Sequence, residues 1–293
     1  MKQRHQLVLG LKEGDRGFGL HGMITQGITA DHLSKAKGRQ FPAERIAGSL
    51  YNAEVATVDE AIAQLLLGLE EQGILEDCLI ILTGDHGETF WEHGDSWNHG
   101  LWLYKTTTRL PWIMNWPDAP WQPGSRIDQP SSTVDLVPTL CGLLNVPVGG
   151  DLGGEDWGPA FRGEAFQRGP VYSVATQPIL PALENKSPKW ANAEKPHAVR
   201  LGPWKLIDSK YNSVQQLFHL GRDPGEKNNL LAAKELDQEA SGAHVQLLGL
   251  LNAFRASAKP LPSVFDPTQA QEVAARLGAM GYAHGTEPDE GKD

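Results

Sequence analysis

Residues 79–88 read LIILTGDHGE, and the rest of the chain can be organised around them. The first five residues, 79–83, form a short apolar run, which predicts a strand buried on both faces. A turn-forming group, GDHG at residues 84–87, follows at once. In an open parallel sheet, ligands bind outside the carboxyl ends of the strands. We therefore expect a ligand-binding loop directly after this strand.

Asp85 and His86 are candidate metal ligands in this loop. Side by side, they offer a carboxylate oxygen and an imidazole nitrogen to one divalent cation. The glycines on either side of the pair let the backbone turn tightly and come close to a ligand. The alternative is a strand-ending turn in which Asp85 caps a following helix.

The segment that begins at His86 is dense in polar and aromatic side chains. It contains Glu88, Glu92 and three histidines, His86, His93 and His99. Their spacing differs from that of structural zinc sites, and no cysteine accompanies them. We interpret Asp85 as a metal ligand and His86 as a second ligand or as a neighbour that hydrogen-bonds the substrate anion. His99 is interpreted as a substrate contact.

Further along the chain, patterns predict helices and short strands. Apolar residues at steps of three and four predict a helix over 44–72 with one stripe against a sheet, and residues 132–144 and 236–257 also read as helices. Asp135, at the start of the second helix, is interpreted as a helix cap, with a catalytic role as the alternative. Short strand-like runs at 171–174, 198–200, 204–207 and 216–220 predict an antiparallel sheet.

Composition excludes several classes of protein. The 293 residues carry a formal net charge of −10 and show no basic patch, which argues against a nucleic-acid partner. Two cysteines do not indicate a disulfide framework. No run of 18 or more apolar residues is present, so no membrane-spanning segment is expected.

Residues 79–94, LIILTGDHGETFWEHG, resemble the T-x-DHGE-x-x-x-EHG segment of sulfatases in the alkaline-phosphatase-like superfamily. Similar family patterns recur at residues 51–59, 132–140, 199–230 and 276–282, so the resemblance covers roughly residues 45–285. It implies an α/β fold in two parts. Residues 1–165 would form part of an alkaline-phosphatase-like three-layer sandwich, and residues 166–293 a smaller C-terminal α+β subdomain with a short antiparallel sheet, a helix and a disordered tail.

The resemblance implies a metal-dependent hydrolase of sulfate esters that acts on a small molecule or a saccharide. Asp85 and His86 would bind the metal ion, and His86 and His99 would contact the substrate. His99 would also be catalytic, because it takes the anion-facing place next to Gly100, where many sulfatases have a lysine. Two ligands do not by themselves distinguish Ca²⁺ from Mg²⁺; Ca²⁺ is the expected ion.

The family's nucleophile is missing from these residues. Sulfatases convert the Cys or Ser of a C/S-x-P-x-R motif to formylglycine, and no Cys or Ser here fits that motif. The family's early D-D metal-binding pair is also absent. The chain thus resembles the C-terminal portion of a sulfatase, and we expect it to hold only part of the active site and to be inactive alone.

Two alternatives remain open at this stage. One is a phosphodiesterase or phosphonate hydrolase of the same superfamily, and the other is a non-catalytic remnant. Strands without neighbours would leave an exposed sheet edge, which would promote self-association.

Overall fold

The computed structural model describes residues 43–90, 92–93, 99–147, 149–150, 152–176, 194–210 and 213–258. The predicted family segment at 276–282 and the predicted disordered tail lie outside the described residues. The predicted domain boundary at 165/166 falls between helix α7 (Gly158–Phe161) and strand β3 (Val171–Val174), and it stays a prediction. None of the helices in the described ranges combines the length and apolarity needed to cross a bilayer.

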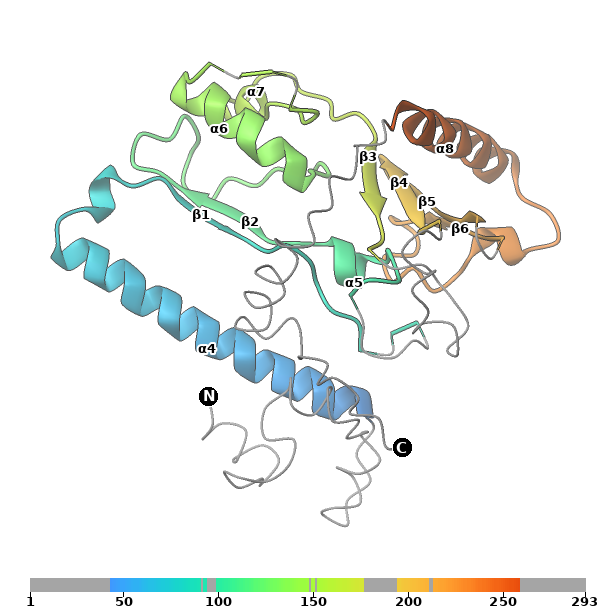
Figure 1. Ribbon diagram of the computed structural model, residues 1–293, viewed down its shortest axis with the longest axis horizontal. Helices are drawn as coiled ribbons and strands as arrows, with labels where there is room; N and C mark the ends of the chain where they lie inside the picture. Colours follow the sequence, from blue (N-terminus) through green and yellow to red (C-terminus); the bar gives the residue numbers. More distant parts are fainter. Residues whose placement is uncertain are drawn as a thin grey trace, which may run out of the picture. The chain divides into compact units, whose positions relative to one another are not determined.

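The predicted first helix is confirmed as α4, Ala43–Glu71, the long blue helix of Figure 1. It ends before Gly73, which adopts a positive φ of 67° that suits a glycine after a helix. The predicted packing of its apolar stripe is wrong, because Val55, Val58 and Leu65 are 52%, 54% and 62% exposed. Within the described part of the chain, this stripe has no sheet to cover it.

The strand that precedes the DHG motif is β1, Ile80–Thr83, which follows the 3-10 turn η1, Leu75–Asp77. It pairs with β2, Trp112–Asn115, in an antiparallel register that places Thr83 opposite Trp112. The expectations of a parallel neighbour and of burial on both faces are therefore wrong for β1. Among the described residues β1 has one paired strand, so its side chains keep much of their exposure, as at Leu82 (37%).

The predicted helix at 132–144 is confirmed as a 3-10 turn η2, Thr133–Asp135, that leads into α6, Leu136–Leu144. Asp135 is fully buried and forms a capping box with Ser132. Its carboxylate also accepts hydrogen bonds from the backbone nitrogen of Glu155, the indole of Trp157 and the guanidinium of Arg168. This network supports the interpretation of Asp135 as a cap that pins the helix.

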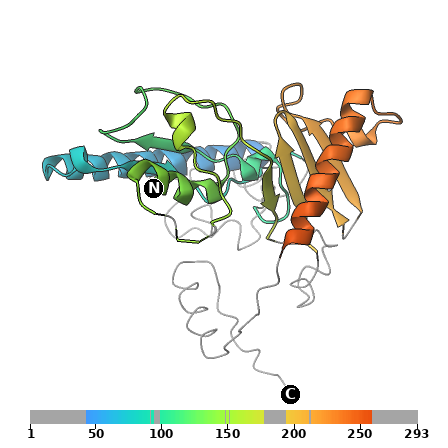
Figure 2. The same ribbon diagram turned by 90° about the horizontal axis from the view of Figure 1, so that it is seen from above.

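The C-terminal part contains the predicted antiparallel sheet, in the order β3-β4-β5-β6. The strands are β3 and the three that follow it along the chain: β4 (His197–Leu201), β5 (Trp204–Ser209) and β6 (Val214–His219). The predicted last helix is α8, Gln238–Ser257, and a 3-10 turn η5, Leu230–Ala232, precedes it. Figure 2 shows α8 lying across this sheet.

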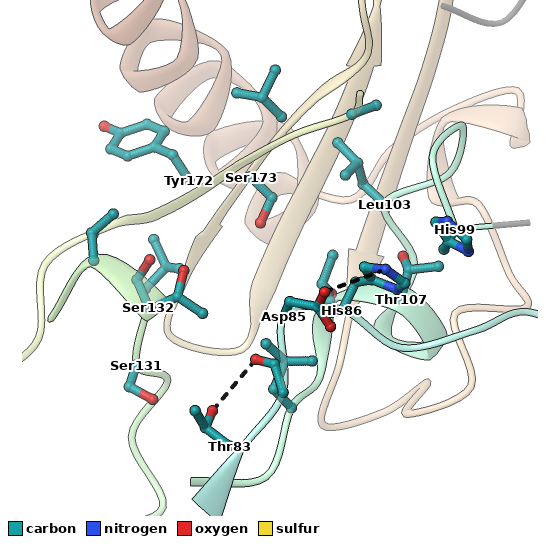
Figure 3. A pocket seen from close by; sticks show the side chains of 18 of the residues that line it. Thr83, Asp85, His86, His99, Leu103, Thr107, Ser131, Ser132, Tyr172 and Ser173 are labelled. Carbon is teal, nitrogen blue, oxygen red and sulfur yellow. Dashed lines mark hydrogen bonds and ion pairs between the residues drawn. The ribbon is translucent and has the colours of Figure 1, made fainter. Parts of the chain in front are cut away.

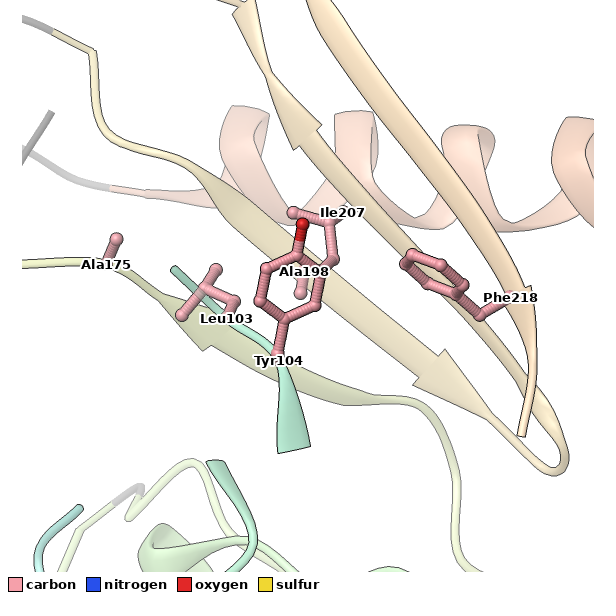
Figure 4. Packing of buried hydrophobic residues seen from close by; sticks show 6 residues of the cluster. All are labelled: Leu103, Tyr104, Ala175, Ala198, Ile207 and Phe218. Atoms are coloured by element: carbon pink, nitrogen blue, oxygen red, sulfur yellow. The ribbon is translucent and has the colours of Figure 1, made fainter. Parts of the chain in front are cut away.

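Alternating side chains of the sheet build a core on each of its faces. Val199, Leu206 and Leu217 are completely buried in a cluster that includes Leu247 and Leu251 of α8. Successive residues of a strand point to opposite faces of the sheet. The residues next to Val199, Leu206 and Leu217 therefore belong to a second cluster, on the other face. Figure 4 shows this second cluster, which consists of Ala198, Ile207, Phe218, Ala175, Leu103 and Tyr104. The second cluster thus fixes the chain segment that follows the predicted site loop.

Candidate active site

A pocket of about 1100 Å³ opens where β1 ends. Its walls come from the end of β1, the segment 99–103, the short helix α5 (Lys105–Thr108), the start of η2 and strand β3. Asp85, His86 and His99 all line this pocket, and Figure 3 shows them with neighbouring polar residues such as Thr83, Ser131 and Ser173. The structure therefore brings the three predicted site residues together.

His93 does not join this group. Its ring stacks on the ring of Tyr104, with centroids 3.6 Å apart and planes 9° apart, and it is absent from the residues that line the pocket. Two of the three histidines in the motif segment therefore gather at one place.

Asp85 offers an ionised carboxylate. Its Oδ1 accepts a hydrogen bond from the backbone nitrogen of His86, at 2.9 Å. This bond is the largest influence on Asp85 and lowers the pKa of its carboxyl group, against a smaller opposing effect of burial. The side chain is 79% exposed, so water also solvates the charge. Asp85 therefore presents a negative oxygen at neutral pH.

The neutral form of His86 has an unprotonated nitrogen beside this carboxylate. Its Nδ1 lies 2.9 Å from the carbonyl oxygen of Gly87. Because a carbonyl only accepts, Nδ1 must donate, and in the neutral ring Nε2 then carries a lone pair. This Nε2 lies 3.7 Å from Oδ2 of Asp85. A backbone carbonyl that orients an imidazole in this way is a common feature of histidines that bind metals.

The fit to a divalent cation is partial. Asp85 and His86 give one oxygen and one nitrogen donor, but the described residues contain no group of three or more His, Cys, Asp or Glu side chains placed to hold a metal ion. Ca²⁺ takes six to eight oxygen ligands and Mg²⁺ near-octahedral geometry. The pair can therefore serve as two ligands of a larger set.

His99 lies against this pair. Its ring stacks on the ring of His86, with centroids 4.1 Å apart and planes 18° apart. Its Nδ1 lies 3.0 Å from Oε2 of Glu88. Sequence reasoning assigned no role to Glu88, although it follows the DHG motif directly. The two partners are 11 residues apart, and no local periodicity links positions at that separation.

The backbone of the site segment packs against α5. The backbone nitrogen of Gly87 donates to the carbonyl of Thr107 in α5, at 2.9 Å. A Cβ at Gly87 would lie 2.0 Å from the carbonyl oxygen of Thr106, so the position requires glycine. The motif backbone therefore lies directly on α5.

The C-terminal sheet holds α5 in turn. The completely buried side chain of Glu226 accepts a hydrogen bond from the backbone nitrogen of Lys105, at 2.5 Å, and pairs with Nζ of Lys205, at 2.6 Å. The hydroxyl of Tyr104 lies 3.0 Å from Oε1 of Gln216. Residues far apart in the sequence therefore place the segment that carries His99.

Comparisons with known proteins find similar sequences among sulfatases. Residues 31–146 match the model of the family described as Sulfatase. An N-acetylglucosamine-6-O-sulfatase of Bacteroides thetaiotaomicron is 29% identical over 192 residues, which are 63% of this chain and 32% of the relative. Arylsulfatase K of Bos taurus is 24% identical over 220 residues, or 72% of this chain and 37% of the relative. The chain spans about a third of the length of these relatives.

Solved structures show the same fold. A protein in complex with its substrate D-glucosamine-2-N,6-O-disulfate matches with a TM-score of 0.59 and 24% identity, over 78% of this chain and 46% of that chain. The phosphonate monoester hydrolase of Agrobacterium radiobacter matches with a TM-score of 0.61 and 21% identity, over 73% and 42%. The fold is alkaline-phosphatase-like. On the DHG motif and these comparisons, the chain is similar to sulfatases, and residues 31–146 carry the match to the family model.

Proposed function

We propose that this chain forms part of the active site of a sulfatase that hydrolyses a sulfate ester of a saccharide or another small molecule. The observation that carries the proposal is the convergence of Asp85, His86 and His99 at one pocket, with Nε2 of His86 3.7 Å from Oδ2 of Asp85. The relative named N-acetylglucosamine-6-O-sulfatase supports a sulfated sugar as the substrate class.

In this proposal Asp85 and His86 bind a divalent ion. Ca²⁺ is the favoured ion because it tolerates flexible coordination and ligand sets completed by water or other groups. The ion would supply positive charge that polarises the sulfate oxygens as a Lewis acid. The described residues contribute two donors, so the remaining ligands would come from outside them.

His99 would contact the sulfate group or the leaving oxygen of the ester. Its side chain is 49% exposed at the pocket, and its Nε2 has no hydrogen-bond partner within the described ranges. Histidine is the side chain most often used in general acid–base catalysis, which transfers a proton to or from a reacting group. We assign His99 this role.

The nucleophile would come from another polypeptide segment. No Cys or Ser of the sequence lies in a C/S-x-P-x-R motif, the source of formylglycine in sulfatases. In the proposal these 293 residues therefore carry binding and acid–base groups, and they do not hydrolyse the ester by themselves.

Titration calorimetry tests the binding part of this proposal. We expect the chain to bind Ca²⁺ weakly and then to bind glucosamine-6-sulfate only when Ca²⁺ is present. Asp85→Asn should abolish both signals. Asp118→Asn removes the same charge from an exposed turn and should change neither.

The same titrations separate the alternatives. A folded chain that binds neither Ca²⁺ nor the sulfate ester would contradict the proposal and favour the non-catalytic remnant. Tighter binding of a phosphonate monoester than of the sulfate ester would instead favour the phosphonate hydrolase. Turnover of a fluorogenic aryl sulfate by the chain alone would refute the claim that its nucleophile lies elsewhere.

A further inference from the structure

We infer that Glu88 is a positioning residue, which holds His99 in the tautomer with its hydrogen on Nδ1 and leaves Nε2 as the atom available to the substrate. The functional consequence rests on the proposed role of His99. The tautomer itself does not, and it can be measured in the chain without metal or substrate.

The hydrogen bond between the two side chains carries the inference. Oε2 of Glu88 lies 3.0 Å from Nδ1 of His99, within the range of an N–H···O hydrogen bond. An ionised carboxylate only accepts, so the hydrogen must belong to Nδ1. In a neutral imidazole the second nitrogen, Nε2, then has a lone pair. The partner of one ring nitrogen thereby decides the chemistry of the other.

Glu88 is placed to act as a fixed acceptor. The preceding residue, Gly87, is bound to α5 by its backbone nitrogen, and the following residue, Thr89, is completely buried. The side chain of Glu88 is 21% exposed, less than half the exposure of His99. A side chain anchored in this way loses little further freedom when it binds His99.

The carboxylate depends on His99 for its hydrogen bonding. Oε1 of Glu88 is buried and has no hydrogen-bond partner among the residues that the structure describes. Oε2 is therefore the carboxylate oxygen that has a partner among these residues, and this partner is Nδ1 of His99. Because a buried acceptor without a partner is costly, loss of this bond would disfavour the present loop conformation.

The other side of the His99 ring is restrained by His86. The two rings stack nearly parallel, and Nδ1 of His86 donates to the carbonyl of Gly87. Each imidazole therefore gives its Nδ1 hydrogen to an acceptor on the motif segment, and each keeps an unprotonated Nε2. The arrangement assigns neighbouring roles to the two nitrogens: His86 toward the metal ion, and His99 toward the ester.

Nitrogen NMR on the histidine-labelled chain tests the inference directly. Spectra are recorded at increasing alkaline pH until the ring signals no longer change, so that the neutral imidazole is observed. We expect the His99 ring in the wild type to carry its hydrogen on Nδ1, with an unprotonated signal from Nε2. A wild-type ring with its hydrogen on Nε2 would overturn the inference without the need for any variant.

Variants separate positioning from folding. Glu88→Ala should shift the population of His99 toward the Nε2–H tautomer, and Glu88→Gln, which keeps the size and an acceptor oxygen, should shift it less. Glu92→Gln removes the same charge from an exposed neighbour and should leave His99 unchanged. An unchanged tautomer in a folded Glu88→Ala variant would refute the positioning role.

The Ca²⁺-dependent binding of glucosamine-6-sulfate gives the functional readout. Residues that orient metal ligands typically contribute 10–100-fold to affinity or activity. By analogy, we expect the Kd to rise roughly tenfold in Glu88→Ala and to stay unchanged in Glu92→Gln. A changed tautomer with an unchanged Kd would refute the role of Glu88 in substrate binding. Failure of the wild type to bind the ester would instead count against the proposed function, and the tautomer result would stand.

Discussion

The buried ion pair between Lys205 and Glu226 should be a main determinant of stability. The side chains are 6% and 0% exposed, and Nζ lies 2.6 Å from Oε1. Glu226 also accepts the backbone hydrogen bond from Lys105 at the start of α5. In Glu226→Ala, Lys205 would remain buried without a counter-charge. Removal of one partner of a buried pair costs about 3–5 kcal/mol, so we expect a loss of that size in the free energy of unfolding.

The backbone of Glu226 refines this estimate. Its φ of 54° lies in the left-handed region, which costs a side-chain-bearing residue roughly 1 kcal/mol and a glycine almost nothing. Glu226→Gly should therefore lose about 1 kcal/mol less than Glu226→Ala. Glu226→Gln keeps an acceptor for Lys105 and removes only the charge, so its loss should also be smaller.

The loss should depend on pH. Burial lowers the pKa of Lys205, and Glu226 partly opposes this shift. In Glu226→Ala the opposing effect is gone, so the pKa falls further below the unfolded value of about 10.4. Between the folded and unfolded pKa the unfolded state binds more protons, and stability rises with pH. This window begins at lower pH in the variant, so its deficit should shrink between pH 7 and about pH 9.5.

Urea unfolding followed by tryptophan fluorescence, at both pH values, measures these differences. Glu235→Ala, an exposed glutamate close in sequence, serves as the control and should stay within about 0.5 kcal/mol of the wild type. A loss below about 1 kcal/mol in Glu226→Ala, or a deficit that grows with pH, would refute the reasoning.

Three further predictions concern packing, polar burial and association. Gly87→Ala should destabilise by about 1–3 kcal/mol, because its Cβ would lie 2.0 Å from a backbone oxygen of α5; Gly68→Ala in α4 meets open space and should stabilise by about 1 kcal/mol. Asp135→Asn should cost about 3–5 kcal/mol in urea unfolding, because it removes one of the two carboxylates, Asp135 and Glu155, that pair with the buried guanidinium of Arg168 and puts a donor in place of a buried acceptor. Val58→Gln together with Leu65→Gln should reduce the self-association that the exposed stripe of α4 favours, measured by sedimentation velocity.

Each of these predictions has a result that would contradict it. Equal melting temperatures for the two glycine variants would show that the contact at residue 87 is not tight. A fully stable Asp135→Asn variant would mean that the network around α6 needs no charge. A chain that stays monomeric at all concentrations would show that the stripe of α4 does not mediate association.

Local features of the fold could be predicted because they depend on residues close in sequence. The strand before the DHG motif, the helix after Ser132 and the alternating strands between 197 and 219 all follow from side-chain periodicity. The capping role of Asp135 belongs to the same group, since its first partner, Ser132, is three residues away. Asp85 and His86 were recognisable for the same reason, as adjacent donors at a strand end.

Tertiary structure alone decided the rest. The antiparallel pairing of β1 with β2, the exposure of the α4 stripe and the contact between Glu88 and His99 depend on the path of the chain through space. Glu226 is the clearest case: it acts on Lys105, 121 residues earlier, and nothing near it in sequence indicates that contact. Local periodicity determines which segments form helices and strands, whereas only packing decides which polar groups meet when those segments come together.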